Sequence, residues 1–184
     1  GKVLSFQMEE LPGNHSTAEL KGYVAETADC IGWQMQGRII TVHTEGEGRP
    51  IYSGMVRTAY IEEENGLQSI SLKLASGTVC MDLVKKDHSY QDTGMSYGAL
   101  IGQVAAQAGA GAVYPSYLDN VPLEAPRIQY QETDWAFLQR MASHFCLPLY
   151  PEATGGGARV YVGVPENGKA AELEWTEYTA VMDD

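Results

Sequence analysis

The chain has 184 residues, of which 44% are hydrophobic, and it carries a formal net charge of -12. This length predicts one domain or two small ones, and the hydrophobic share excludes a wholly disordered chain. The acidic excess argues against direct binding of nucleic acid or an anionic membrane surface, and no apolar run approaches the roughly 20 residues that span a bilayer.

Residues 1–90 show the patterns of β-strands. Arg38–Thr44 is rich in β-branched residues, Pro50–Ile61 is a longer run of the same kind, and Leu67–Ala75 alternates with a period of two. Gly54 inside the second run predicts a bulge or a sharp bend. Asn65-Gly66 predicts a tight hairpin turn before the third run. Short strands at this spacing favour a sandwich or a small barrel.

Residues 91–146 are mostly helical in pattern. Ser96 is a candidate N-cap, and the apolar positions after it fall on one helical face: Tyr97, Leu100, Ile101, Val104 and Ala108. Glycine at 109–111 predicts the end of this helix. Arg127–Gln131 follows as a short candidate strand.

A second helix is predicted after Thr133, which can cap it, with Asp134 in the first turn where the helix dipole favours a carboxylate. Its apolar positions are Trp135, Leu138, Met141, Ala142 and Phe145, and Pro148 would stop it. The last stretch returns to strand patterns at Leu147–Pro151 and Arg159–Val164, joined by a glycine turn at 155–157. Leu173–Met182 is a further candidate strand.

Few residues are arranged for known chemistry. The three cysteines, Cys30, Cys80 and Cys146, are odd in number and widely spaced, which excludes a disulfide framework and a paired-cysteine metal site. The four histidines are scattered, and the sequence has no phosphate loop, serine elbow or zinc-protease motif. We therefore expect no metal and no cofactor. Glu132 and Asp134 leave a carboxylate-pair glycosidase open, although capping and solvation explain them at least as well.

The segment Ile128–Tyr150 resembles a motif of phage late control D proteins and of the spike proteins of type VI secretion. In that family a strand ending in Gln-Tyr-x-Glu-Thr-Asp leads into a helix carrying Phe-Leu-x-Arg. The matching positions are Gln129, Tyr130, Glu132, Thr133, Asp134, Phe137, Leu138 and Arg140. Tyr52–Val56 and Asp87–Ala108 also resemble family segments, so the resemblance covers roughly residues 38–165.

The physical role expected of this motif is structural. Arg140 lies six residues after Asp134 and does not face it on the helix, so we expect Glu132 and Arg140 to anchor strand ends or a neighbouring subunit.

The resemblance implies an α+β, mainly β fold of small β-barrel-like hub domains with a helical segment between them. Residues 1–90 would form the first hub domain, 91–127 the helical connection, and 128–184 the strand–helix–strand part of a second hub domain, complete or not. Family members are generally longer, so the chain corresponds to a fragment or to a short version.

The resemblance also implies a function without catalytic residues. The chain would be a structural baseplate hub protein of a phage or prophage contractile tail, or of a tail-like injection system. It would assemble in the bacterial cytoplasm as a homotrimeric ring that joins the tail spike to the tail tube, and it would end in the virion tail.

Two other functions stay open on the residues alone. A carbohydrate-active, cell-wall-degrading enzyme would use Glu132 and Asp134 and predicts a cleft that holds an acid pair. A small-ligand-binding barrel predicts one enclosed apolar cavity. The hub function instead predicts flat apolar patches on the flanks of a barrel.

Overall fold

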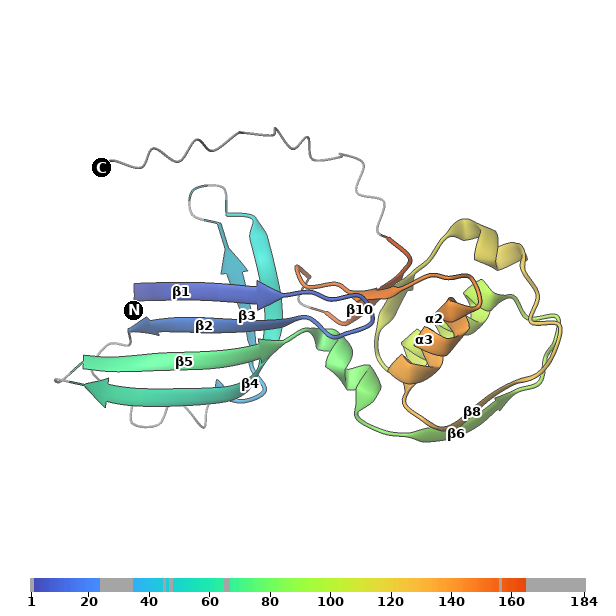
Figure 1. The fold of residues 1–184 in the computed structure, drawn as a ribbon, viewed down its shortest axis with the longest axis horizontal. Helices are drawn as coiled ribbons and strands as arrows, with labels where there is room; N and C mark the ends of the chain where they lie inside the picture. Colours follow the sequence, from blue (N-terminus) through green and yellow to red (C-terminus); the bar gives the residue numbers. More distant parts are fainter. Residues whose placement is uncertain are drawn as a thin grey trace, which may run out of the picture.

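The computed structural model describes residues 2–23, 35–44, 46, 48–64, 67–155 and 157–164. A curled sheet forms one part of the molecule, and two helices with short strands around them form the other (Figure 1). Most elements are strands, which confirms the expected mainly β fold class.

The curled sheet has five antiparallel strands in the order β1-β2-β5-β4-β3. Their bounds are β1 Lys2–Glu9, β2 Thr17–Tyr23, β3 Ile39–His43, β4 Pro50–Glu64 and β5 Leu67–Ala75. Ala18, Val56, Leu72 and Leu74 form its apolar core with Tyr52, which is fully buried. The sheet is therefore a half-barrel with one apolar and one polar face.

The three strands predicted in this region are confirmed as β3, β4 and β5. The predicted turn at Asn65-Gly66 lies outside the described residues, and the strands on either side pair in antiparallel register up to Glu64 and Leu67.

The irregularity predicted at Gly54 lies elsewhere in β4. The register shifts between Val56 and Thr58, so Arg57 is the extra residue of the bulge. Gly54 is required for a different reason. A Cβ at this position would lie 2.6 Å from Cε1 of Tyr52 and 2.8 Å from the carbonyl oxygen of Ala75. The glycine therefore permits close packing rather than a bend.

The second part contains η1 Gly77–Asp82, β6 Lys86–Tyr90, α2 Tyr97–Gln107, β7 Gly111–Val113, η2 Ser116–Asn120, β8 Arg127–Glu132, α3 Asp134–Ser143, β9 Leu149–Pro151 and β10 Arg159–Val162. Strand β6 pairs with β8, and β7, β10 and β9 form a small mixed sheet. One hydrophobic core extends from Met81 to Val162 and includes the buried faces of both α2 and α3. The division of the chain at residues 90 and 127 stays a prediction.

Both helices begin as the sequence predicted. The Ser96 side chain accepts a hydrogen bond from the amide of Ala99, and α2 ends before Gly109, whose φ is 74°. The last predicted apolar position of α2, at 108, packs partly buried against the core. The Thr133 side chain caps α3 in the same way.

Helix α3 ends at Ser143 rather than at Pro148, and Phe145 packs on the core from beyond the helix. The chain has already left the helical conformation at Cys146, whose φ is 57°.

The two predicted C-terminal strands are confirmed as the antiparallel pair β9 and β10, with slightly narrower bounds. Part of their glycine turn, Gly156, lies outside the described residues, as does all of Leu173–Met182.

Candidate structural site

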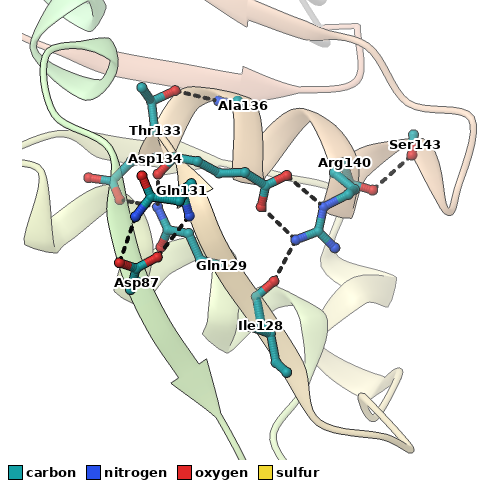
Figure 2. A network of polar contacts seen from close by, with 10 residues as sticks. Asp87, Ile128, Gln129, Gln131, Thr133, Asp134, Ala136, Arg140 and Ser143 are labelled. Atoms are coloured by element: carbon teal, nitrogen blue, oxygen red, sulfur yellow. Dashed lines mark hydrogen bonds and ion pairs between the residues drawn. The ribbon is translucent and has the colours of Figure 1, made fainter.

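The predicted motif residues lie where β8 passes into α3, against β6 (Figure 2). The pairing of β6 and β8 is irregular after Lys86, and Gln131 has a positive φ of 50°. Asp87 holds this irregular position, because its two carboxylate oxygens accept hydrogen bonds from the backbone and the side chain of Gln131 at 2.9 and 2.8 Å. The strand therefore ends in a fixed geometry before the helix begins.

Arg140 ties α3 back to β8. Its guanidinium donates two hydrogen bonds to the carboxylate of Glu132, at 2.9 and 2.7 Å, and a third to the carbonyl oxygen of Ile128 at 2.7 Å. Arg140 therefore connects α3 to the end of β8 within this chain, and the anchoring role expected of the pair stays a prediction. Their ion pair keeps the Arg140 pKa above its ordinary value, since the hydrogen bonds that Arg140 donates to Glu132 stabilise the charged guanidinium.

Asp134 is buried at the start of α3 and is 3% exposed. One of its oxygens accepts a hydrogen bond from the ammonium of Lys86, and the other accepts one from the side-chain amide of Gln129 at 3.0 Å. Gln129 is itself buried and also donates to the carbonyl oxygen of Glu132. Because a buried charge without partners is costly, these contacts explain why a carboxylate is tolerated here.

A chain of polar contacts runs from Thr133 to the curled sheet. The hydroxyl of Thr133 caps α3 and donates to Asp82 in η1, whose other oxygen lies 3.6 Å from His15 Nε2. The other ring nitrogen of His15 bonds Thr78, which bonds Ser76 at the end of β5. Burial of the imidazole lowers the pKa of His15, and the nearby Asp82 opposes this shift.

Helix α3 also holds the loop between β1 and β2. The indole of Trp135 and the side-chain amide of Gln139 both donate to the carbonyl oxygen of Gly13, at 2.9 and 2.6 Å. The amide of Gly13 donates to Leu149 in β9. Helix α3 therefore fixes the curled sheet to the second part of the molecule.

Two motif residues fill the core, and one faces solvent. Phe137 and Leu138 are fully buried, and the Phe137 ring stacks on Tyr90 with centroids 5.5 Å apart. Tyr130 is 72% exposed on the outside of β8. The motif thus combines a cap, a buried acid, an ion pair and two core side chains.

Solved structures share this architecture. A tail protein of 43 kDa from prophage MuSo2 of Shewanella oneidensis superposes with a TM-score of 0.64 and 14% identity, over 86% of this chain and 51% of that one. The c3393 protein of E. coli gives a TM-score of 0.67 and 13% identity, over 87% and 45%. It is described as a component of the type VI secretion system that resembles the T4 tail proteins gp27 and gp5.

A tail protein from Neisseria meningitidis MC58 gives a TM-score of 0.61 and 15% identity, over 90% of this chain and 47% of that one. The chain has the fold of phage tail proteins. The resemblance read from the motif is confirmed at this level.

This chain spans about half the length of the tail proteins that it matches. A scan of its sequence against family models found no match, and a search of curated proteins found no similar sequence.

The two acids of the candidate glycosidase pair already have partners within the chain. Glu132 is occupied by Arg140, and Asp134 by Lys86 and Gln129, so the two acids stabilise the strand–helix junction. Across the described part of the chain, no group of three or more His, Cys, Asp or Glu residues is placed to hold a metal. No helix in the same part is long and apolar enough to cross a membrane.

Sequence reasoning missed the partners that the motif finds elsewhere in the chain. Lys86, Asp87 and Asp82 lie 44 to 51 residues before the residues of the β8–α3 junction that they contact, and Gly13 lies more than 120 residues before Trp135. No periodicity or local motif marks them, because their role exists only once β6 pairs with β8.

Proposed function

We propose that this chain is a structural hub component of a phage contractile tail or a tail-like injection system. Three copies form a ring that joins the tail spike to the tail tube. The ring assembles in the bacterial cytoplasm and becomes part of the virion tail or its equivalent.

The shared fold carries this proposal. Three proteins from tail-like machines match 86–90% of the chain, including both the curled sheet and the helical part. The motif supports it as well, since its polar residues fix the sheet to the helices and would give a ring subunit a rigid shape.

The ion pairs of Glu132 and Asp134 support a structural rather than a catalytic role for these two acids. A carboxylate-pair glycosidase needs one acid that can give a proton and a second that is free to attack or to activate water. Glu132 accepts two hydrogen bonds from Arg140, and Asp134 accepts one each from Lys86 and Gln129. Neither acid is free for that task.

The exposed edge of the curled sheet is the surface that we assign to subunit contact. Strand β1 is an edge strand in the described sheet. Val3, Leu4 and Met8 on it are 61%, 51% and 42% exposed. An edge strand presents unpaired backbone groups as well as side chains, so a second copy can gain both hydrogen bonds and apolar burial there.

The test is the solution mass measured by light scattering over a concentration series. The proposal expects a mass that rises to three times 20.0 kDa. A monomer at every concentration would contradict ring formation by this chain.

A matched pair of variants locates the contact. Leu4→Lys places a charge on the exposed edge and should shift the assembly towards monomer. Val84→Lys places the same charge at another exposed apolar residue, 62% exposed, in the segment before β6, and should leave the mass unchanged. Equal effects of the two variants would remove β1 from the interface.

A further inference from the structure

The polar face of the curled sheet is hollowed into an open groove of about 860 Å3. Side chains from four neighbouring strands line it, among them Glu9, Thr17, Glu19, Arg57, Thr58 and Lys73. The proposed subunit contact lies on the β1 edge, where Met8 also borders this groove, and the motif site lies in the other part of the molecule.

Charge is separated across the groove. Glu9 and Glu19 come from β1 and β2, and Lys73 and Arg57 come from β5 and β4. The sheet order β1-β2-β5-β4 therefore gives the groove an acidic wall and a basic wall. Buried Leu74 and Ala75 form part of the surface between the walls.

The basic wall includes the bulge in β4. Arg57 and Thr58 both line the groove, and the register shift between Val56 and Thr58 makes Arg57 the extra residue of the bulge. Bulges commonly redirect the side chains of a strand. Within the described ranges, no carboxylate lies within ion-pair distance of the Arg57 guanidinium.

The acidic wall is held in place by its own contacts. Glu19 accepts a hydrogen bond from the Ser71 hydroxyl at 3.2 Å and lies 3.3 Å from the Lys21 ammonium. These hydrogen bonds, from Lys21 first, lower the pKa of Glu19, so it stays ionised at neutral pH. Glu19 faces Lys73 across the β2–β5 pairing.

We propose that this groove binds a short extended peptide that carries a positive charge at one end and a negative charge at the other. The carboxylate is held by Arg57 on β4 and the ammonium by Glu9 on β1, while the cross-strand neighbours Glu19 and Lys73 lie between them. The site does not depend on the proposed hub function.

The width of the groove favours a peptide of about four residues. Strands lie about 4.8 Å apart, so the distance from β1 to β4 across β2 and β5 is about 14 Å. An extended chain of four residues spans roughly the same length at about 3.3–3.6 Å per residue. Arginine is suited to the negative end because its planar fork matches a carboxylate.

The experiment is a titration of the full chain with zwitterionic tetra-alanine, followed by the backbone amide signals of Thr17, Thr58 and Lys73. We expect saturable shifts at these amides. Tetra-alanine blocked at both ends has neither charge and should give no shifts. An end-blocked peptide of sequence Lys-Ala-Ala-Glu carries the same two charges on its side chains and should also give saturable shifts.

Two variants test the two walls separately. Arg57→Gln and Glu9→Gln should each weaken the binding of tetra-alanine by about fivefold, as expected for exposed charge pairs. Lys85→Gln removes an exposed charge outside the groove and should leave the affinity unchanged. Unchanged melting temperatures verify that each variant is folded.

The proposal is overturned if tetra-alanine gives no shifts at the groove amides, or if the blocked neutral peptide binds equally well. It is also overturned if both wall variants bind as tightly as the unchanged chain.

Discussion

At the scale of single residues, Arg140 is the side chain whose chemistry is most specific. It makes two parallel hydrogen bonds to Glu132 and a third to the backbone of β8. Lysine keeps the charge but cannot supply this fork. We expect Arg140→Lys to lower the free energy of unfolding by about 1 kcal/mol, the upper range for a partly exposed ion pair, as measured by urea denaturation.

Arg159 provides the matched control, because it pairs with Glu152 at 3.1 Å with a more exposed side chain. Arg159→Lys should lower the free energy of unfolding clearly less than Arg140→Lys does. Equal losses in the two variants would show that the fork at Glu132 adds nothing beyond its charge.

His15 predicts a dependence of stability on pH. The folded state holds the His15 pKa below the ordinary value of 6.5, because burial of the ring outweighs the opposing effect of the nearby Asp82. The unfolded chain therefore takes up the proton at a higher pH than the folded chain. The contribution of His15 to the free energy of unfolding should be fully present above pH 6.5 and should be lost as the pH drops through and below this value.

His15→Gln removes this contribution, so its free energy of unfolding should change less between pH 7.5 and pH 5.5 than that of the unchanged chain, in denaturation measured by circular dichroism. A remaining dependence is expected from His144, whose pKa burial also lowers. Identical pH dependence in the variant would rule out His15 as the source.

Sequence reasoning at this scale identified the residues but not all of their partners. Thr133 and Ser96 were predictable as caps, since a cap depends on a few adjacent residues. The burial of Asp134 was not, because its position in the first turn also suits an exposed carboxylate. The contact with Lys86 depends on the pairing of two strands far apart in the sequence.

At the scale of elements, segments with a clear hydrophobic pattern were predictable, while no local pattern identified β1, β2, β6 or β7. The pattern of α2 places its apolar residues on one face, and Leu100, Ile101 and Val104 are fully buried there. Strand β6 has no such pattern, since of its five residues only Tyr90 is buried. Strand β7 has three residues and forms only by pairing with β10. Tertiary contacts create these short strands.

Gly54 in β4 provides a prediction at this scale. A Cβ here would meet the Tyr52 ring and the Ala75 carbonyl inside the distance that real side chains adopt. Gly54→Ala should therefore lower the free energy of unfolding by about 1–3 kcal/mol, the usual cost of overpacking, as measured by urea denaturation.

Gly102→Ala in α2 is the matched control, because the nearest atom to its Cβ would be the Tyr114 hydroxyl at 3.9 Å. Alanine favours a helix more than glycine does, so this variant should stabilise the chain by about 0.5–1 kcal/mol. If both variants stabilise the chain, the close packing around position 54 does not require glycine.

At the scale of the whole molecule, the sheet and the helical part depend on each other through a few long-range contacts. Gly13 accepts hydrogen bonds from α3, and the carbonyl oxygen of Ala153 accepts one from Ser53 in β4. Ala153 also packs into the core of the curled sheet. The sequence pattern indicated a change from strands to helices halfway along the chain. It did not indicate these long-range contacts, since each involves one backbone group in a loop.

The net charge of the molecule predicts how the proposed ring responds to salt. Each copy carries a formal charge of -12, so three copies in contact repel one another at neutral pH. The screening length falls from about 30 Å at 0.01 M salt to about 8 Å at 0.15 M. Apolar contact at the β1 edge does not weaken over this range. Raising the sodium chloride concentration should therefore drive the light-scattering mass from that of one copy towards three times 20.0 kDa.

Sucrose, which is uncharged, serves as the control for general effects of added solute and should not reproduce the steep onset at low salt. A mass that falls with added salt would mean that attractive charge pairs hold the copies together, and the contact would then have to lie away from the apolar edge.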